Sequence, residues 1–267
     1  MTIFSSDVFT GKHALVTGAT GGIGYETAKA LAQMGADVTI TGRREEVLNE
    51  LKEEIQDDFP EAKVFIVVAD LTNASDRETL VQEAEDKMGP VSLLVNSAGI
   101  TGGGVMEDLT QEELEKVMHV NFTVPILLTQ QIYESMKKNK EGAIVNVSSL
   151  SGLRGTYGGT AYTGSKFALN AFTQSFGLEA IEHNIRVNAV CPGYVDTKMG
   201  RDGIRRKGER ENRSFEEQLK IENANLPSGR ISTAREVANT ITFLLTDAAE
   251  NVVGEAVKIS GGSVMGL

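Results

Sequence analysis

The sequence is poor in the side chains that hold disulfides and metal ions. It has a single cysteine, Cys191, and only three histidines, His13, His119 and His183, which are far apart in the chain. One cysteine excludes an intramolecular disulfide and a thiolate metal cluster, and scattered histidines argue against a metal site. No apolar run approaches the ~18 residues that a membrane helix needs, and residues 1–12 lack the apolar core of a signal peptide. We therefore expect a cytoplasmic protein with no bound metal and no membrane partner.

Positive charge is scarce as well. The 267 residues include 26 Lys and Arg against 37 Asp and Glu, a net charge of -11. A general nucleic-acid binder needs clustered Lys and Arg to contact phosphates, so we expect no nucleic-acid partner. The chain is otherwise of ordinary globular composition, 40% hydrophobic and 24% charged.

Short apolar runs alternate with longer helical patterns along almost the whole chain. The expected strands are His13–Thr17, Asp37–Thr41, Val64–Ala69, Ser92–Asn96, Ala143–Ser148, Arg186–Cys191 and Ala256–Ile259. The expected helices span about 23–34, 44–57, 73–87, 110–138, 161–182 and 233–246. Nearly continuous apolar strands are typical of parallel sheets that are covered on both faces. The alternation predicts an α/β fold with a doubly wound parallel sheet of about seven strands and helices on both faces.

We expect one domain over residues 1–267, because no linker, repeat or low-complexity tract divides the chain. Two segments interrupt the alternation. Thr101–Asp108 is a glycine-rich loop after a strand, and 198–227 is a long connection before the last helix. Long connections in compact domains tend to be functional lids or disordered, and we interpret residues 198–227 as a lid.

A glycine-rich loop, residues 17–24, follows the first strand and opens the first helix. Gly18, Gly22 and Gly24 allow a tight turn and let the backbone approach a pyrophosphate at the helix N-terminus, where free N–H groups favour negative charge. The alternative is a turn that serves strand–helix packing alone. At the front of an alternating chain, the loop favours dinucleotide binding.

The end of the second strand predicts which dinucleotide is bound. This position meets the adenosine ribose, where a carboxylate selects NAD. The chain instead has Arg43 and Arg44, with no carboxylate before Glu45. Guanidinium groups bind a 2′-phosphate bidentately, so we expect NADP(H) to be favoured over NAD(H), mainly through Arg43. The alternative is that one or both arginines begin the next helix as solvated residues.

Tyr162 and Lys166 lie four residues apart in a helical segment, and hence on one face, one turn apart. Leu169, Phe172 and Phe176 continue that face and should anchor it to the sheet. The helix follows a strand, so Tyr162 should lie near the crevice at the carboxyl ends of the strands, where ligands bind in open α/β sheets. Ser149 precedes Tyr162 by 13 residues, at the hydroxyl-bearing end of a buried strand.

In this order and spacing, the motifs resemble those of the short-chain dehydrogenase/reductase family of Rossmann-type enzymes, in its compact subtype. The resemblance covers nearly the whole chain and rests on residues 17–24, Asp70-Leu71, Asn96-Ser97-Ala98-Gly99, Asn121, Ser149, Tyr162, Lys166 and Pro192–Thr197. The sequence departs from the family pattern in two places. Ser97 replaces the commoner second asparagine, and Gly21 stands where many NADP-preferring members carry a basic residue.

The resemblance implies roles for four catalytic residues. Tyr162 would exchange a proton with the substrate, and its pKa of ~10 would be lowered by Lys166 and the positive nicotinamide. Lys166 would also bind the nicotinamide ribose. Ser149 would donate a hydrogen bond to the substrate oxygen, where charge develops. Asn121 would hold a water of a proton relay; the alternative is a polar residue that distorts its helix without a chemical role.

The resemblance also implies the cofactor contacts. Thr20 and Ile23 would lie on the phosphates, and Asp70 with Leu71 beside the adenine. Asn96, Ala98 and Gly99 would bring their backbone against the ribose. The segment Pro192, Gly193, Val195 and Thr197 would fix the nicotinamide ring and its carboxamide.

The activity implied is NADP(H)-dependent reduction of a ketone to a secondary alcohol, most like that of 3-oxoacyl-carrier-protein reductases and polyketide-type ketoreductases. An alternative is NAD(P)-dependent oxidation of a secondary alcohol or 3-hydroxyacid by the same residues. A nucleotide-binding scaffold without turnover is a third reading, against which the presence of both Tyr162 and Lys166 counts.

Two further features concern partners. Residues 198–213 carry seven basic against three acidic side chains, and a cationic patch steers anionic partners. On a lid, this patch suits a phosphopantetheine thioester carried on CoA or an acyl carrier protein; the alternative is a solvated amphipathic helix.

The catalytic helix also carries Phe167, Ala171 and Leu178 on its second face. A helix apolar on two faces is usually covered on both, so we expect a homodimer or homotetramer.

Overall fold

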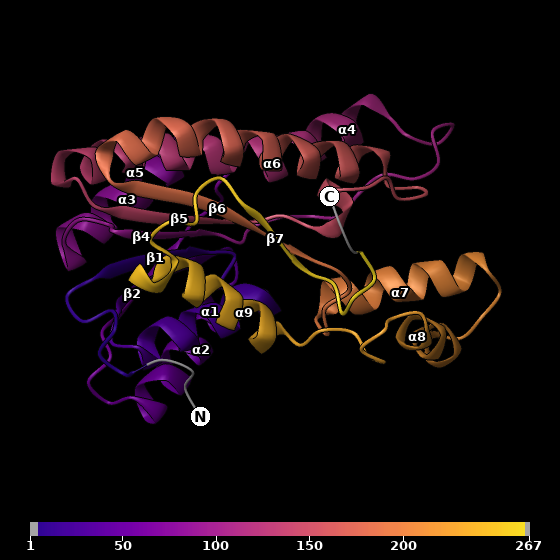
Figure 1. Ribbon diagram of the computed structural model, residues 1–267, viewed down its shortest axis with the longest axis horizontal. Coiled ribbons are helices and arrows are strands. Elements are labelled where there is room, and N and C mark those ends of the chain that lie inside the picture. Colours follow the sequence, from indigo (N-terminus) through magenta and orange to yellow (C-terminus); the bar gives the residue numbers. More distant parts are fainter. Residues whose placement is uncertain (1–4, 265–267) are drawn as a thin grey trace.

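The computed structural model describes residues 5–264, and its centre is a parallel sheet of seven strands in the order β3-β2-β1-β4-β5-β6-β7 (Figure 1). The strands are β1 (His13–Thr17), β2 (Asp37–Gly42), β3 (Val64–Val68), β4 (Leu93–Asn96), β5 (Gly142–Val147), β6 (Ile185–Pro192) and β7 (Ala256–Ile259). The predicted doubly wound sheet is confirmed, and each predicted strand agrees with the structure to within one residue at either end.

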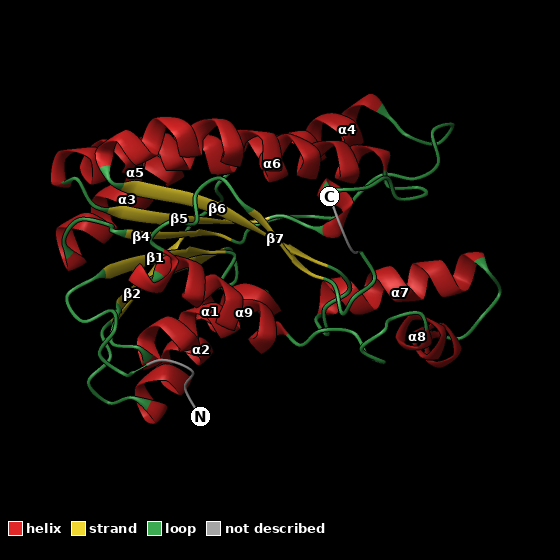
Figure 2. Ribbon diagram, in the orientation of Figure 1, coloured by secondary structure: helices red, strands yellow, loops and turns green. Residues whose placement is uncertain are grey.

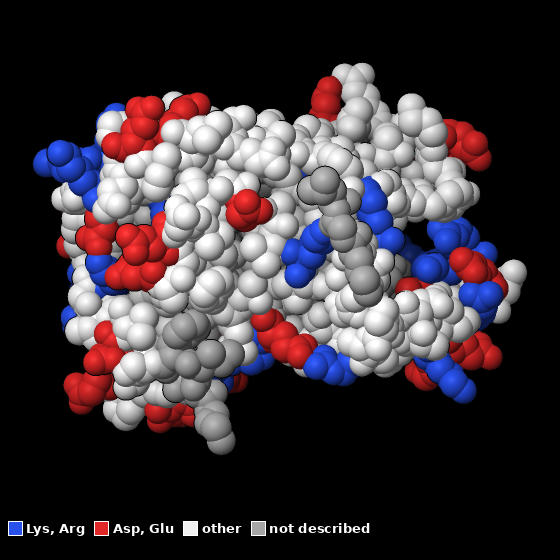
Figure 3. Space-filling model, in the orientation of Figure 1, with Lys and Arg blue, Asp and Glu red and all other residues white. Residues whose placement is uncertain are grey.

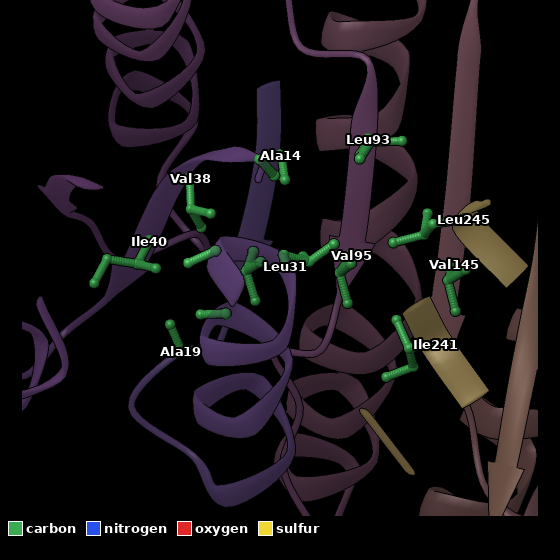
Figure 4. Close-up of a cluster of buried hydrophobic side chains, with 14 of the residues drawn as sticks. Ala14, Ala19, Leu31, Val38, Ile40, Leu93, Val95, Val145, Ile241 and Leu245 are labelled. Carbon is green, nitrogen blue, oxygen red and sulfur yellow. The ribbon is translucent and has the colours of Figure 1, made fainter. Parts of the chain in front are cut away.

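Helices cover both faces of the sheet (Figure 2). The helices are α1 (Gly22–Gln33), α2 (Glu45–Asp58), α3 (Ala74–Met88), α4 (Gln111–Met118), α5 (Val124–Asn139), α6 (Thr160–Ala180), α7 (Lys198–Arg210), α8 (Phe215–Ala224) and α9 (Ala234–Leu245). Leu31, Ile241 and Leu245 of α1 and α9 pack on one face of the strands, in the cluster that Figure 4 shows. Leu128 of α5 and Phe176 of α6 belong to a second cluster, on the opposite face.

The strand order places the crevice. β2 and β3 lie on one side of β1, whereas β4 to β7 lie on the other. The connections that leave β1 and β4 therefore run in opposite directions, and a gap opens between their carboxyl ends. Such a topological switch point is where ligands bind in open α/β sheets.

The predicted helix 110–138 is interrupted. A π-helical turn, His119–Thr123, separates α4 from α5 and contains Asn121. Pro125 has no N–H to offer the carbonyl of Asn121, four residues back, so the regular hydrogen-bond ladder breaks there. The proline was the sequence signal for this interruption.

The predicted lid, 198–227, folds as a helical hairpin of α7 and α8 that projects from the body of the molecule (Figure 1). The side chains of Thr197 and Ser214 cap the two helices, and Ser214 with Glu217 forms a capping box. Gly208 allows the helices to pack closely, since a Cβ there would lie 3.2 Å from the Cβ of Gln218. Glycine in α7 therefore serves packing.

Candidate active site

The glycine-rich loop forms a cradle with no room for side chains. Gly18 has a φ of 64°, and a Cβ at this residue would lie 2.8 Å from the backbone of Ala98. A Cβ at Gly24 would lie 2.4 Å from the carbonyl oxygen of Gly18. Gly22, at the start of α1, is equally close to the Thr197 side chain, with 2.5 Å between a Cβ and its Cγ2. The loop therefore brings the start of α1, the end of β4 and the start of α7 together.

Thr17 fixes the neighbouring end of β4. Its hydroxyl accepts hydrogen bonds from the backbone N–H groups of Ser97 (3.0 Å) and Ala98 (3.1 Å). These bonds hold the segment 96–99 against the glycine loop. The replacement of asparagine by Ser97 leaves this arrangement intact, because the contact is made by backbone. Sequence reasoning did not single out Thr17; its signal is a threonine at the last position of a buried strand.

Charged groups gather at the carboxyl ends of β2 and β3. Arg43 and Arg44 are exposed, and Arg44 donates a hydrogen bond to the Thr20 carbonyl in the glycine loop. Asp70 accepts two hydrogen bonds from Thr72, which together with the charge of Arg43 lower the pKa of its carboxyl. Arg44 is the N-cap residue of α2, and its guanidinium is engaged by the hydrogen bond to the glycine loop. Arg43 is not, and its charge acts on Asp70 at the crevice.

Ser149, Tyr162 and Lys166 come together at the end of β5. The Lys166 ammonium donates to the Val147 carbonyl at 2.9 Å and lies 5.7 Å from the centre of the Tyr162 ring. The Ser149 hydroxyl accepts the N–H of Ser151 at 3.1 Å and is hydrogen-bonded to Tyr162. One helical turn of α6 and one strand end therefore position all three side chains.

Burial dominates the electrostatics of this group. It lowers the pKa of Lys166 to about 8, because an ammonium that is only 5% exposed loses its hydration. Burial also raises the pKa of Tyr162, and the hydrogen bond with Ser149 opposes the change. Tyr162 is therefore held as the neutral phenol near neutral pH, the form that gives up a proton.

Gly99 joins the cradle to the catalytic group. A Cβ at this residue would lie 3.6 Å from the Lys166 ammonium and 3.2 Å from the Asn121 side-chain oxygen. Asn121 clamps the next residue, accepting from the N–H of Ile100 at 2.8 Å and donating to its carbonyl at 2.9 Å. Its amide also donates to Ser165 at 3.0 Å. The Asn121 side chain thus fixes the segment that approaches Lys166.

Two buried asparagines brace this end of the sheet. The Asn96 amide donates to Thr129 (3.1 Å) and to Asn146 (2.9 Å), so its side chain points into the layer of α5. Asn170, one turn beyond Lys166 on α6, donates to the Gly152 carbonyl at 2.9 Å. That contact holds the short turn that follows Ser149. Asn170 was missed from the sequence; its signal is a polar residue on the buried face of an apolar helix.

The segment after β6 closes the far side of the crevice. The N–H of Gly193 donates to the Ile259 carbonyl at 3.0 Å, and a Cβ at Gly193 would lie 3.2 Å from Leu150. Pro192 and Val195 are buried, and Thr197 caps α7 beside Gly22. The segment therefore runs from the turn behind Ser149 to the glycine loop.

The crevice opens into a hollow between the part of the surface over α4 and α6 and the part over α7 and α8, and Lys and Arg side chains line its rim (Figure 3). The Arg206 side chain reaches Thr101 at 3.4 Å, and the Arg210 guanidinium lies 4.6 Å from the centre of the Tyr157 ring. The hairpin thus touches the loops after β4 and β5 across the hollow.

The residues fit a nicotinamide dinucleotide. Glycines at which a Cβ would clash line the start of α1, and the free N–H groups of a helix start suit a pyrophosphate. The segments 96–99 and 192–197 lie on either side of the path from this cradle to Tyr162. Within residues 5–264, no group of three or more His, Cys, Asp or Glu side chains is arranged to hold a metal ion. None of the helices in the same range has the length and apolarity to cross a bilayer.

Comparison with known proteins agrees with this geometry. The profile of the short chain dehydrogenase family matches residues 12–207. An acetoacetyl-CoA reductase from Acinetobacter sp. (strain RA3849) is 33% identical over 254 residues, 95% of this chain and 98% of the relative. A 3alpha-hydroxysteroid dehydrogenase from Mediterraneibacter gnavus is 32% identical over 252 residues, 94% of this chain and 96% of the relative.

Among solved structures, a variant of actinorhodin polyketide ketoreductase crystallised with NADPH superimposes with a TM-score of 0.91. It shares 33% sequence identity, and the match covers 96% of this chain and 98% of the other.

Proposed function

The chain belongs to the short-chain dehydrogenase family, and from this premise we propose that it reduces the ketone of a 3-oxoacyl thioester with NADPH. Family membership makes it a nicotinamide-dependent oxidoreductase that acts on CH–OH or carbonyl groups. Relatives named acetoacetyl-CoA reductase and polyketide ketoreductase support the reductive direction and the thioester. The observation that carries the proposal is the group of Ser149, Tyr162 and Lys166 beside the glycine cradle.

In this reaction the neutral Tyr162 donates its proton to the carbonyl oxygen. NADPH, when bound, supplies the hydride that the carbonyl carbon takes up. The Ser149 hydroxyl accepts the Ser151 N–H and keeps its own proton to donate to the same oxygen, which stabilises the charge that develops there. Lys166 stabilises the phenolate that remains on Tyr162, because its ammonium lies beside the ring in a poorly hydrated site.

Tyr162 must then regain a proton from solvent. Asn121 is a positioning residue for this step, since its side chain is fully used in clamping Ile100 and bonding Ser165. Its backbone carbonyl lies in the π-helical turn and lacks its ordinary helical donor because Pro125 has no N–H. We infer that this carbonyl holds a water that links Lys166 to solvent.

We propose that NADP(H) is preferred and that Arg43 is the main reason. Arg43 is exposed at the end of β2, where its charge acts on Asp70, whereas Arg44 is bonded to the glycine loop. The test is the ratio of kcat/KM for NADPH to that for NADH. Arg43→Ala should lower this ratio about tenfold, the order of one charge-assisted hydrogen bond. An unchanged ratio would remove the proposal.

The second candidate function is the oxidation of a secondary alcohol, which the 3alpha-hydroxysteroid dehydrogenase among the relatives supports. The same residues serve both directions, with Tyr162 accepting a proton as phenolate. This direction needs the phenolate, and burial raises the pKa of Tyr162, so oxidation should need a higher pH than reduction.

We further propose that residues 1–267 form one domain that assembles as a homodimer or homotetramer through α6. Phe167 is 46% exposed and Leu178 is 73% exposed on the outer face of this helix. Two large apolar side chains exposed on one helix face favour an interface there. Light scattering at micromolar concentration should give two or four chains, and a monomer would contradict the proposal.

The proposed activity is tested by a substrate panel. NADPH oxidation is followed with acetoacetyl-CoA, a simple cyclic ketone and a steroid ketone, and the matching alcohols are offered with NADP. Reduction of acetoacetyl-CoA with a kcat/KM well above that of the other carbonyls is expected. Turnover of the cyclic ketones alone would reject the thioester, and turnover of the alcohols with NADP at a higher kcat/KM than any ketone would favour the second candidate.

A further inference from the structure

The α7–α8 hairpin carries more positive charge than its acidic residues neutralise. Six of the seven basic side chains of residues 198–213 make ion pairs with carboxylates, and only four carboxylates serve them. Asp202 holds both Lys198 and Arg205, and Glu211 holds both Arg210 and Arg213. The seventh, Arg206, makes no ion pair with any residue that the structure describes. Surplus charge is therefore left on this helix.

Arg206 and Arg210 direct that surplus toward the hollow. They lie four residues apart, on one face of α7. Arg206 contacts the neutral hydroxyl of Thr101, and Arg210 lies over the ring of Tyr157, in the two loops on the other side of the hollow. Both are close enough to Tyr194, which follows Gly193 at the crevice, for their charges to act on its hydroxyl.

The position of α7 sets how far these two arginines lie from the glycine cradle. The N-cap residue of α7, Thr197, lies beside Gly22 of the glycine cradle. With a rise of 1.5 Å per residue, Arg206 and Arg210 lie about 13 and 19 Å along the axis from that point. Both arginines therefore lie in the half of α7 away from the glycine cradle, where the helix faces the loops of Thr101 and Tyr157.

We propose that Arg206 and Arg210 form an anion subsite that binds the phosphate of the substrate's phosphopantetheine arm at the mouth of the hollow. The inference rests on the thioester reduction proposed above. Arginine suits this role because its planar fork binds phosphate oxygens bidentately. Arg206 is the principal ligand, since it has no carboxylate to give up, and Arg210 shares Glu211 with Arg213.

The test uses two substrates that differ by one phosphate, acetoacetyl-pantetheine 4′-phosphate and acetoacetyl-pantetheine. The wild-type enzyme should prefer the phosphorylated substrate by about tenfold or more in kcat/KM, mainly through KM, as expected for a charge-assisted hydrogen bond. Arg206→Gln should abolish most of that preference while changing kcat/KM for the unphosphorylated substrate less than about twofold. Arg206→Lys should retain part of it, because a point charge replaces a fork.

The matched control is Arg205→Gln. Arg205 is the neighbouring exposed arginine, but it lies over Phe215 and pairs with Asp202, so its loss should leave the preference unchanged. The KM for NADPH should be the same in all variants. An equal loss on both substrates would overturn the subsite, because it would mean that Arg206 only supports the loop at Thr101.

The outcomes separate the subsite from the proposed function. If both thioesters are reduced but the wild type does not distinguish them, the subsite is wrong and the thioester function stands. If neither thioester is reduced while a simple ketone is, the thioester function fails and the subsite with it. The kcat/KM of the wild type for acetoacetyl-CoA and for an acetoacetyl acyl carrier protein then shows which carrier is preferred, and Arg206→Gln should lower kcat/KM for both.

Discussion

Two helices, α6 and α7, line the same crevice but differ in how far their charged side chains are buried. α6 is held by burial: Lys166 is 5% exposed, and Leu169 and Asn170 are similarly covered. α7 instead carries its charges on an exposed face, with ion pairs such as Arg201 to Asp196 and Arg205 to Asp202. A buried charge changes its pKa, whereas an exposed one keeps its charge and is screened by water.

The difference divides the work between the helices. Poor hydration on α6 lowers the pKa of Lys166 to about 8 and raises the pKa of Tyr162, so that Tyr162 remains the protonated donor. The exposed side chains of α7 include several arginines, a residue type that binds anions but does not exchange protons in proteins. Chemistry therefore belongs to the buried helix and recognition to the exposed one.

The strongest test of the buried side is Tyr162→Phe. Without the hydroxyl no side chain is left to protonate the carbonyl oxygen, and kcat/KM for reduction should fall about a thousandfold. NADPH binding, followed by its fluorescence, should persist because the glycine cradle is unaffected. A residual rate above a tenth of the wild type would show that the proton comes from elsewhere.

The pH dependence is the next largest effect. The pKa of Lys166 lies at about 8, lowered by burial, so its ammonium is present below that pH and is lost above it. The rate of reduction should therefore decline above pH 8, approaching tenfold per pH unit. Stopped-flow measurement of kcat on both sides of pH 8 checks this. Lys166→Arg, which stays protonated, should be slower but lose the decline; a wild-type rate that is flat well above pH 8 would contradict the role of the ammonium.

Most of the fold could be predicted from the sequence, because a parallel sheet buried on both faces leaves uninterrupted apolar runs. The glycine cradle and the group of Ser149, Tyr162 and Lys166 were accessible for the same reason: each lies at the end of such a run. The break between α4 and α5 was not predicted, although Pro125 is a sequence signal for it. Hydrophobic periodicity alone does not reveal a π turn, because the turn rotates the apolar face of the helix without interrupting the run of apolar residues.

The hairpin was harder to predict. α7 contains Gly200, Gly203 and Gly208, which indicate a loop by propensity. The structure shows that two of them are required by contacts: a Cβ at Gly200 would lie 2.0 Å from the Val195 carbonyl oxygen, and Gly208 abuts α8. Such contacts leave no periodic signal. The contacts of Arg206 and Arg210 with distant loops are likewise tertiary. The sequence therefore predicts that the hairpin is positively charged, but not which part of the molecule the charged side chains face.

Within the exposed side, the ion pairs should differ in strength according to burial. Lys207 binds Glu222 at 2.7 Å, and the carboxylate is 11% exposed and also accepts from Gln218. Lys207→Met should lower the free energy of unfolding by about 1–2 kcal/mol, since it leaves a nearly buried carboxylate without its cation; the loss is smaller than for a fully buried pair because the Lys207 side chain is 34% exposed. Urea unfolding measures the loss, and limited proteolysis should show early cleavage in residues 198–227. Lys220→Met, at an exposed position on α8, is the control and should change neither.

The smallest effect is expected at Lys198, whose side chain is 87% exposed although it lies 2.7 Å from Asp202. Water screens this pair, and Arg205 remains on the same carboxylate after its loss. Lys198→Gln should therefore change the free energy of unfolding by less than about 0.5 kcal/mol. Urea unfolding of this variant and of Lys207→Met under the same conditions gives the comparison directly. Equal losses for the two would mean that burial does not grade the ion pairs of the hairpin, and the contrast between α6 and α7 would then rest on the pKa of Lys166 alone.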